Sequence, residues 1–271
     1  MLHATYRRAG GPLEVRDAWL GQAAVPGAVE YVLSMDADDA ATLAVTEGLP
    51  RVVNPAWPGV VTAVRNWNAA AAAASGDLLV VVADDLFPPP GWDQDLIAMI
   101  GRLDPVRTSF VLKLADDPAP GDVLLRHPVV SRAFYDRFGL FSPSFRGVYC
   151  DNEFTTRAFW CSVILDGRSL RLDHRHPTLS TGTTRSESHE RLNQREEYER
   201  AAAEYQAAWS GRKRGVKPRL VPTDPPQSLS HWRLVAAQHR LRALANLRYA
   251  AGRSRLARFA RPWVGPARRP Q

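Results

Sequence analysis

The stretch Ser75–Leu96, SGDLLVVVADDLFPPPGWDQDL, decides the fold of this chain. Its centre is an uninterrupted apolar run, LLVVVA, with Ser-Gly before it and three prolines after it. Such a run is typical of a strand buried on both faces of a parallel sheet. Asp84 and Asp85 follow it directly, so both are expected at the carboxyl end of a central strand, where open α/β sheets bind ligands.

Strand and helix patterns alternate on both sides of this stretch. Strands are predicted at Leu2–Thr5, 28–35, Arg51–Asn54, 108–114 and Ser169–Leu172. Helices are predicted at Leu13–Ala24, 60–74, from Trp92, and at Phe134–Phe138, Asn152–Leu165, Glu187–Trp209 and Leu229–Phe259. The alternation predicts an α/β fold: a doubly wound, Rossmann-like, mainly parallel sheet with helices on both faces. We expect a catalytic domain over 1–210, a linker over 211–227 and a basic amphipathic helical tail over 228–271.

The composition is that of an ordinary soluble protein, with 45% hydrophobic and 23% charged residues among 271. No run approaches the ~18 apolar residues that span a bilayer. The start MLHATYRR lacks a charged-then-apolar leader, so a cytoplasmic location is expected. Two isolated cysteines, Cys150 and Cys161, fit a reducing compartment and core or boundary positions.

The net charge of +7 is concentrated at the end of the chain. Ten arginines and no acid follow Asp224, which leaves 25 basic and 28 acidic residues before that point and a body near −3. Three interpretations of the basic tail stay open. It lies on an anionic membrane, it binds nucleic acid, or it packs on the catalytic domain with a solvated arginine face.

Adjacent aspartates at a buried strand end point to a metal ion. Two carboxylates this close repel each other, and burial increases the cost of both charges. Mg²⁺ or Mn²⁺ would neutralise them, since both ions accept hard oxygen ligands and bridge substrate phosphates. The alternative is a solvated surface pair, which the buried position after the valine run disfavours.

At these residues the chain resembles the inverting family 2 glycosyltransferases of the GT-A fold, over about residues 1–200. The resemblance implies a nucleotide-sugar donor and a DxD-like motif at Ala83-Asp84-Asp85, with Asp85 on the metal and Asp84 on the ribose–diphosphate. It implies further donor contacts from Thr5, Tyr6 and Arg8 in the first loop, from Asp36 to the base, and from Arg65 and Asn66. Trp67-Asn68 departs from the family, which often has a glycine there.

The stretch RGVYCDNEFTTRAFW, residues 146–160, resembles the family's acidic motif at a helix start, which supplies the catalytic base. Asp151 is the first candidate and Glu153 the second. A base must take the proton of the acceptor hydroxyl as that oxygen attacks the anomeric carbon. The alternative for Asp151 is a helix N-cap.

A third stretch, RLDHRHPTLSTG at 171–182, offers the histidine that completes the metal site in many GT-A enzymes. His174 and His176 both resemble it. Their spacing does not separate them, and His176 is preferred because it lies nearer the strand end. The following Thr178–Ser186 has the composition of a mobile loop that closes over donor phosphates, or of an ordinary surface loop.

Together these observations predict a metal-dependent, inverting, hexosyltransferase-type glycosyltransferase acting on a hydroxyl acceptor. The acceptor is a glycan, a lipid-linked glycan or a modified nucleic-acid base. The alternatives are a phage-type enzyme that glycosylates hydroxymethylated DNA bases, and a non-catalytic binding protein for nucleotide sugars or nucleic acid on the same scaffold. The tail leaves association with DNA or with the inner face of a membrane open.

Overall fold

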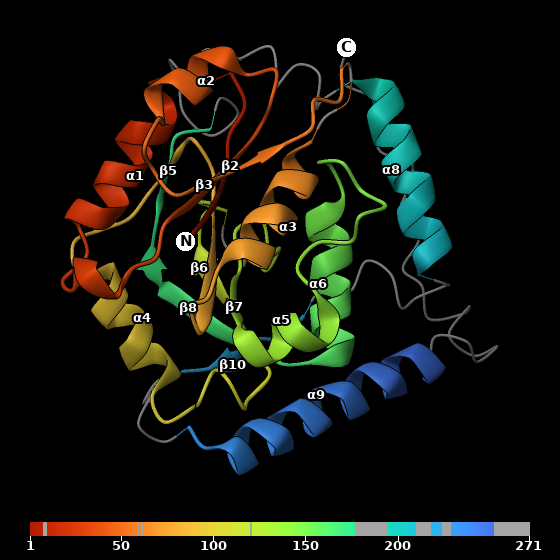
Figure 1. Ribbon diagram of the computed structural model, residues 1–271. Coiled ribbons are helices and arrows are strands. Elements are labelled where there is room, and N and C mark those ends of the chain that lie inside the picture. Colours follow the sequence, from red (N-terminus) through yellow and green to blue (C-terminus); the bar gives the residue numbers. More distant parts are fainter. Residues whose placement is uncertain are drawn as a thin grey trace.

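A single large sheet organises the molecule, seen in a computed structural model that describes residues 1–7, 10–58, 60, 62–119, 121–176, 194–209, 218–223 and 229–251 (Figure 1). In sheet order its eight strands are β10 (Val221–Pro222), β8 (Ile164–Arg171), β6 (Val111–Ala115), β7 (Val129–Ser131), β4 (Leu78–Val82), β1 (Leu2–Ala4), β2 (Val32–Asp36) and β3 (Arg51–Asn54). All neighbours are parallel except β7, which runs antiparallel to both β4 and β6. The predicted α/β class with a mainly parallel sheet is confirmed.

A second, two-stranded antiparallel sheet lies at the carboxyl end of β4. It joins β5 (Leu86–Phe87) to β9 (Asp173–His174), with Leu86 opposite His174 and Phe87 opposite Asp173. This pairing brings the chain after β8 next to the chain after β4.

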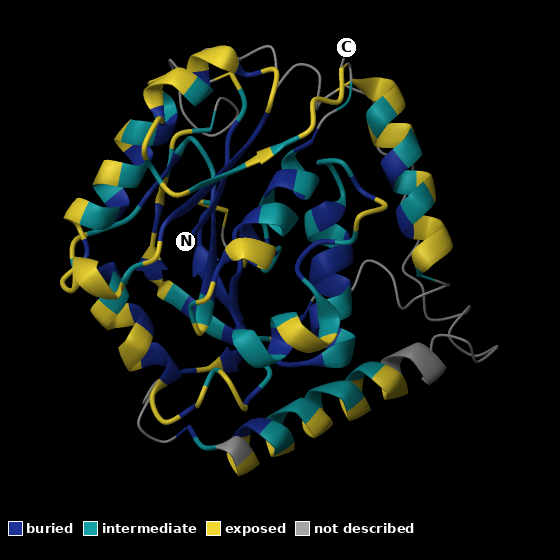
Figure 2. Cartoon of the chain, viewed as in Figure 1, coloured by how far each residue is buried: buried dark blue, intermediate teal, exposed yellow. Residues whose placement is uncertain are grey.

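Helices cover both faces of the large sheet (Figures 1 and 2). On one face lie α1 (Gly11–Gly21) and α4 (Trp92–Ile100). On the other lie α3 (Ala63–Ala73), α5 (Arg132–Phe138), α6 (Cys150–Cys161) and α8 (Arg195–Ala208). The short η1 (Pro26–Ala28) and α2 (Ala40–Val45) flank β2.

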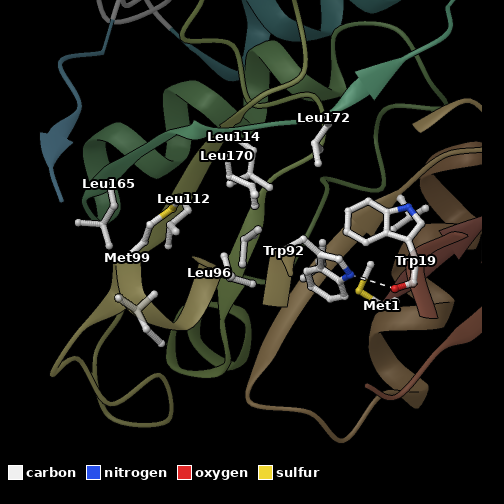
Figure 3. Close-up of a cluster of buried hydrophobic side chains, with 14 of the residues drawn as sticks. Met1, Trp19, Trp92, Leu96, Met99, Leu112, Leu114, Leu165, Leu170 and Leu172 are labelled. Carbon is white, nitrogen blue, oxygen red and sulfur yellow. Dashed lines mark hydrogen bonds between the residues drawn. The ribbon is translucent and has the colours of Figure 1, made fainter. Parts of the chain in front are cut away.

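The apolar alternation of the strands divides the core in two, one part on each face of the sheet. On the α1 and α4 face, Leu112, Leu114 and Leu165 pack with helix residues such as Leu96 (Figure 3). Two tryptophans lock that layer: the Nε1 of Trp92 donates to the carbonyl of Trp19 at 2.9 Å, and the rings meet edge to face. Fully burying such aromatic side chains contributes roughly 2–3 kcal/mol each. The packing on this face therefore stabilises the position of the strand ends.

The end of the described chain packs against both parts of the core through α9 (His231–Ala251). Leu229 and Leu234 join the core on the α1 and α4 face, while Leu241 and Ala245 reach the opposite one. None of the described helices is both long and apolar enough to cross a lipid bilayer. The predicted tail residues after Ala251 lie outside the described residues.

Three sequence predictions need amendment. The helix predicted over Asn152–Leu165 ends at Cys161, because Ser162 turns extended and Ile164 pairs with Val111 as β8 begins. Strand β7 was not predicted, since its three residues are too short to show a period. Val221–Pro222 lies inside the predicted linker but pairs with β8, so this part of it belongs to the sheet.

Both cysteines are free. Cys150 is buried at the start of α6, and burial raises its pKa well above the ordinary thiol value. Cys161 is half-buried at the other end of the same helix.

Candidate active site

Asp84 is held by side chains from the neighbouring strand β1 and from the residue that follows it. Its Oδ1 lies 2.9 Å from the Nε2 of His3, and its Oδ2 accepts from the hydroxyl of Thr5 at 3.1 Å. The other nitrogen of the fully buried His3 lies 2.8 Å from the hydroxyl of Tyr31. This Tyr31–His3–Asp84 chain fixes the carboxylate at the sheet edge, with both oxygens already hydrogen-bonded to protein.

Asp85 turns the opposite way, toward β9. The Nε2 of His174 lies 3.6 Å from its Oδ1, and the backbone N–H of Arg175 donates to its carbonyl at 2.8 Å. Burial alone would raise the pKa of Asp85, but the His174 contact and the charges of His174, His127 and His176 outweigh it and lower this pKa to about 2. Asp85 is therefore a carboxylate throughout the physiological pH range.

His174 has the orientation of a metal ligand. Its Nδ1 lies 2.8 Å from the carbonyl oxygen of Asp116, which fixes the ring and leaves Nε2 toward Asp85. Metal-ligating histidines usually donate their second nitrogen to such a carbonyl or carboxylate. Asp85 and His174 thus offer one hard oxygen and one imidazole nitrogen, a donor pair that fits Mn²⁺ or Mg²⁺ with the remaining ligands from phosphates and water.

His176, the preferred metal ligand at the sequence level, lies close by, with its ring centroid 5.4 Å from that of His174. The ring of His174 faces Asp85 and is held by the Asp116 carbonyl, so His174 is a candidate ligand beside His176. Within the described residues no group of three or more His, Cys, Asp or Glu side chains forms a ready-made metal cage. A cation here would depend on ligands from the substrate.

A buried charge cluster supports this edge from the loop after β6. The ammonium of Lys113, on β6, contacts Asp116 and lies 2.7 Å from Asp122. The Nδ1 of His127 lies 3.0 Å from Asp116, and Arg126 reaches Asp122 at 3.0 Å. Burial alone would raise the pKa of Asp116. The hydrogen bond and charge of His127, and then those of Lys113, hold this pKa well below its usual range.

Sequence reasoning missed this cluster, although a signal was present. Asp116 and Asp117 follow a strand, Val111–Ala115, in the same way that Asp84 and Asp85 follow theirs. The ring of His127 meets that of His174 edge to face at 5.1 Å between centroids. His127 thus lies beside both Asp116 and His174.

Asp151 sits in the first turn of α6. The N-cap of this helix is Tyr149, so Asp151 is not the cap that the alternative interpretation required. Burial raises the pKa of Asp151 above its ordinary value, although the Asn152 N–H and the charges of Arg126 and His127 oppose the rise. Tyr149 has a left-handed φ of 64°, strain of the kind that collects at functional sites.

Glu153 has a different environment. It is buried, and its carboxylate accepts from the guanidinium of Arg157 at 2.9 Å, one turn later on α6. Arg157 also donates to the carbonyls of Phe138 and Leu140, so the pair fastens α6 to the preceding loop. The geometry therefore favours Asp151 over Glu153 as the base.

Asp36, at the end of β2, is almost fully buried and fully engaged by α3. It accepts from Thr62 at 2.5 Å, from Arg65 at 2.8 Å and from Asn66 at 3.0 Å. Arg65 donates as well to the carbonyl of Pro55. The structure gives the predicted donor-binding residues Asp36, Arg65 and Asn66 a role in docking α3 onto the sheet, and their contact with a nucleotide stays a prediction.

The loop after β1 lies against the loop after β2. The hydroxyl of Tyr6 donates to Asp38 at 3.2 Å, and the backbone N–H of Arg7 donates to Asp39. Arg7 has a positive φ of 53°. Arg8, the remaining predicted donor contact, and the predicted loop Thr178–Ser186 lie outside the described residues.

A cavity of about 570 Å³ opens beside this edge, between β6, β8, β10 and the loop after β6. The pairing of β6 with β8 shifts register after Leu114, so residues 168–170 bulge out of the ladder, and Arg168 and Ser169 line the cavity. Ion pairs join Asp166 to Arg168 at 2.7 Å and Asp117 to Arg126 at 3.2 Å. The volume of the cavity is in the range of small-molecule sites. The remaining charged and hydroxylic groups of the wall are Lys113, Asp122, Ser169, Arg171 and Thr223.

No model of a known protein family matches this chain, and no curated protein matches it in sequence. Solved structures similar to it include S. aureus TarS 1–349, at 17% identity and a TM-score of 0.46, covering 58% of this chain and 53% of that one. The complex of the same fragment with UDP-GlcNAc gives 16% identity and a TM-score of 0.49, over 73% of this chain and 68% of that one.

A third similar structure is glucosyl-3-phosphoglycerate synthase from Mycobacterium tuberculosis in complex with Mn²⁺, UDP-glucose and phosphoglyceric acid. It is 14% identical, with a TM-score of 0.41, over 64% of this chain and 70% of that one. In the first of these alignments the chain spans about half the length of the matched structure. Likeness of this degree assigns no activity to the chain.

Proposed function

We propose that this chain is a nucleotide-sugar-dependent, metal-assisted glycosyltransferase that transfers a hexose to a hydroxyl acceptor with inversion. One observation carries the proposal. Asp85 follows β4 at the carboxyl end of the sheet, and the ring of His174, held by the Asp116 carbonyl, faces its carboxylate across 3.6 Å. This pair supports a cation site, and Asp151, in the first turn of α6, is the candidate base.

The metal would be held by Asp85 and His174, with His176 as a further ligand. Bound Mg²⁺ or Mn²⁺ supplies a Lewis acid that offsets negative charge on a departing diphosphate. His3 and Thr5 hold the carboxylate of Asp84 away from His174. We expect Asp84 to contact the donor ribose once these hydrogen bonds are shared with the substrate.

Asp151 would act as the general base. In a single displacement the acceptor oxygen forms a bond to the anomeric carbon, the bond from that carbon to the diphosphate breaks, and the acceptor proton passes to Asp151. A carboxylate with a raised pKa suits this role, because a base works best when its pKa approaches the operating pH. Attack opposite the leaving group inverts the anomeric centre.

The acceptor would enter the cavity beside β8. Asp117, which lines this cavity, is bonded to the same Arg126 whose charge acts on Asp151. Arg171 and Ser169 lie exposed in its wall and offer hydrogen-bond donors to a polar acceptor. The substitution Arg171→Ala should raise the acceptor KM with little change in the donor KM. It would remove a contact that binds the acceptor equally in the ground state and the transition state.

A thermal-shift screen of UDP-, GDP- and dTDP-sugars, with and without Mn²⁺, tests the donor side. One nucleotide class should raise the melting temperature further when Mn²⁺ is present. Asp85→Asn should remove the metal-dependent part. Asp95→Asn, which changes an exposed acid on α4, is the matched control and should keep it. Unchanged donor turnover in Asp85→Asn would refute the metal role.

Two other functions predict different results. A phage-type enzyme for hydroxymethylated DNA bases would transfer sugar to modified duplex DNA and leave glycan acceptors untouched. A non-catalytic protein would bind one nucleotide sugar tightly and neither hydrolyse nor transfer it. Product analysis of radiolabelled donor with each acceptor class separates the three.

A further inference from the structure

Helix α9 carries apolar side chains on two opposite sides. Leu234, Ala237, Leu241 and Ala245 recur at helical spacing and pack against the core. Arg242 turns the same way: it donates to the carbonyl of Ser162 at 3.0 Å, and burial lowers its pKa. This inner face accounts for only part of the apolar surface of the helix.

The opposite face, defined here as the outer face of α9, is exposed along its length (Figure 2). Trp232, Leu244 and Leu247 are 78%, 44% and 66% exposed. No other described helix or strand carries more than one exposed large apolar side chain. A helix that is apolar on both sides normally has a partner on both. The exposed residues of the outer face are Trp232, Arg233, Ala236, His239, Arg240, Ala243, Leu244, Asn246 and Leu247.

The charge of the outer face identifies the chemistry of that partner. Arg233 and Arg240 are exposed among its apolar side chains, and no acidic residue occurs anywhere after Asp224 in the sequence. An anionic partner would complement this charge. It must also accommodate one tryptophan and two leucines. The phosphate backbone of a nucleic acid forms ion pairs with arginines but offers no apolar surface to these side chains. An anionic lipid surface meets both demands, because its headgroups pair with arginine and its interface accommodates Trp and Leu.

We propose that the outer face of α9 binds the surface of an anionic bilayer, with α9 lying parallel to the membrane and the catalytic body above it. From Trp232 to Leu247 the contact would run about 22 Å along the helix. The inner face fixes α9 to both parts of the core, so binding through the outer face would hold the whole molecule at the membrane.

Co-sedimentation of the full chain with vesicles tests this proposal without any measurement of activity. Vesicles of mixed phosphatidylglycerol and phosphatidylcholine should retain the protein, whereas phosphatidylcholine vesicles should not. The double variant Leu244→Gln/Leu247→Gln should lower binding to the anionic vesicles roughly tenfold, because two exposed leucines no longer enter the interface. Ile97→Gln, at a 57% exposed apolar position on α4, is the control and should bind as the parent does.

Charge is tested separately with Ala243→Glu, which adds an acid to the outer face and removes no core contact. It should lower binding to anionic vesicles several-fold and leave the melting temperature unchanged. Arg233→Gln/Arg240→Gln should also reduce the salt dependence of binding, while Arg107→Gln, an exposed arginine after α4, should not.

Three results would overturn the proposal. They are no binding of the parent chain to anionic vesicles, parent-like binding by both the leucine variant and Ala243→Glu, or tighter binding to duplex DNA that the leucine variant does not weaken. The last result would assign α9 to nucleic acid instead. Because the readout is binding, none of these outcomes bears on glycosyl transfer.

Discussion

The two halves of the sheet treat the acids at their strand ends differently. In the half built from β3, β2, β1 and β4, Asp36 receives three donors from α3, and Asp84 is fixed by His3 and Thr5. Asp85 follows β4 as well, but it turns toward the half built from β7, β6, β8 and β10 and faces His174 across 3.6 Å, and Asp151, in the first turn of α6, has a raised pKa. A carboxylate whose acceptor sites are filled by its own protein supports the fold. A carboxylate with fewer donors from its own protein is available for chemistry.

The largest effect should separate Asp151 from Glu153. Asp151→Asn removes the base while keeping size and most packing, so kcat should fall by about 10²–10⁴ with donor affinity retained. Glu153→Gln instead weakens the ion pair with Arg157 and should act mainly through stability. Steady-state kinetics and thermal melting of both variants measure this. Equal kcat losses with equal melting temperatures would contradict the assignment.

The next effect tests the supporting role of the first half. Asp36→Ala leaves Thr62, Arg65 and Asn66 without their buried acceptor, which should lower the free energy of unfolding by about 2–4 kcal/mol. Asp38→Ala, at a partly exposed carboxylate of the adjacent loop, should cost less than about 1 kcal/mol. Urea unfolding compares them. A stable Asp36→Ala protein that no longer binds nucleotide would instead favour the donor contact predicted for Asp36.

A smaller effect is expected on Mn²⁺ affinity, which should respond differently to the loss of each of the two histidines. His174→Ala removes the ring anchored by Asp116 and should weaken Mn²⁺ affinity in the presence of nucleotide by about 10–100-fold. His176→Ala should weaken it less. Isothermal titration with Mn²⁺ gives the ratio. The reverse order would restore His176 as the main ligand.

The smallest effect is a shift of a pH profile. The charge of Arg126 lowers the pKa of Asp151, so Arg126→Gln should raise that pKa further. The base is active when deprotonated, and the acidic limb of kcat/KM should therefore move to higher pH. Arg107→Gln is the control. Movement to lower pH would exclude Asp151 as the group that titrates.

Local patterns predicted the sheet and the Asp84–Asp85 pair because strand burial and strand ends are properties of adjacent residues. The strand order is not local. Strand β7 enters the sheet between β4 and β6, and only that arrangement decides which loops become neighbours. Asp85 meets His174 through the pairing of β5 with β9, almost ninety positions apart in the chain.

The surroundings of the two histidines needed the structure for the same reason. Their spacing along the chain is uninformative, and only the folded chain places the Nδ1 of His174 2.8 Å from the Asp116 carbonyl, which can accept its hydrogen bond. The surroundings of Asp36 and Glu153 also could not be predicted from local patterns. Thr62 and Asn66 reach Asp36 only when α3 packs on the sheet. Arg157 reaches Glu153 only when α6 forms.

The position of α9 across both parts of the core has a consequence for synthesis on the ribosome. Strands β1 to β4 emerge early and pair with one another, but the apolar surfaces that meet Leu234 and Leu241 stay uncovered until α9 leaves the exit tunnel. Exposed apolar surface of this kind makes incomplete chains prone to aggregation. The nascent protein thus depends on its last described helix to finish folding, and a ribosome stalled before α9 would hold a chain that chaperones recognise.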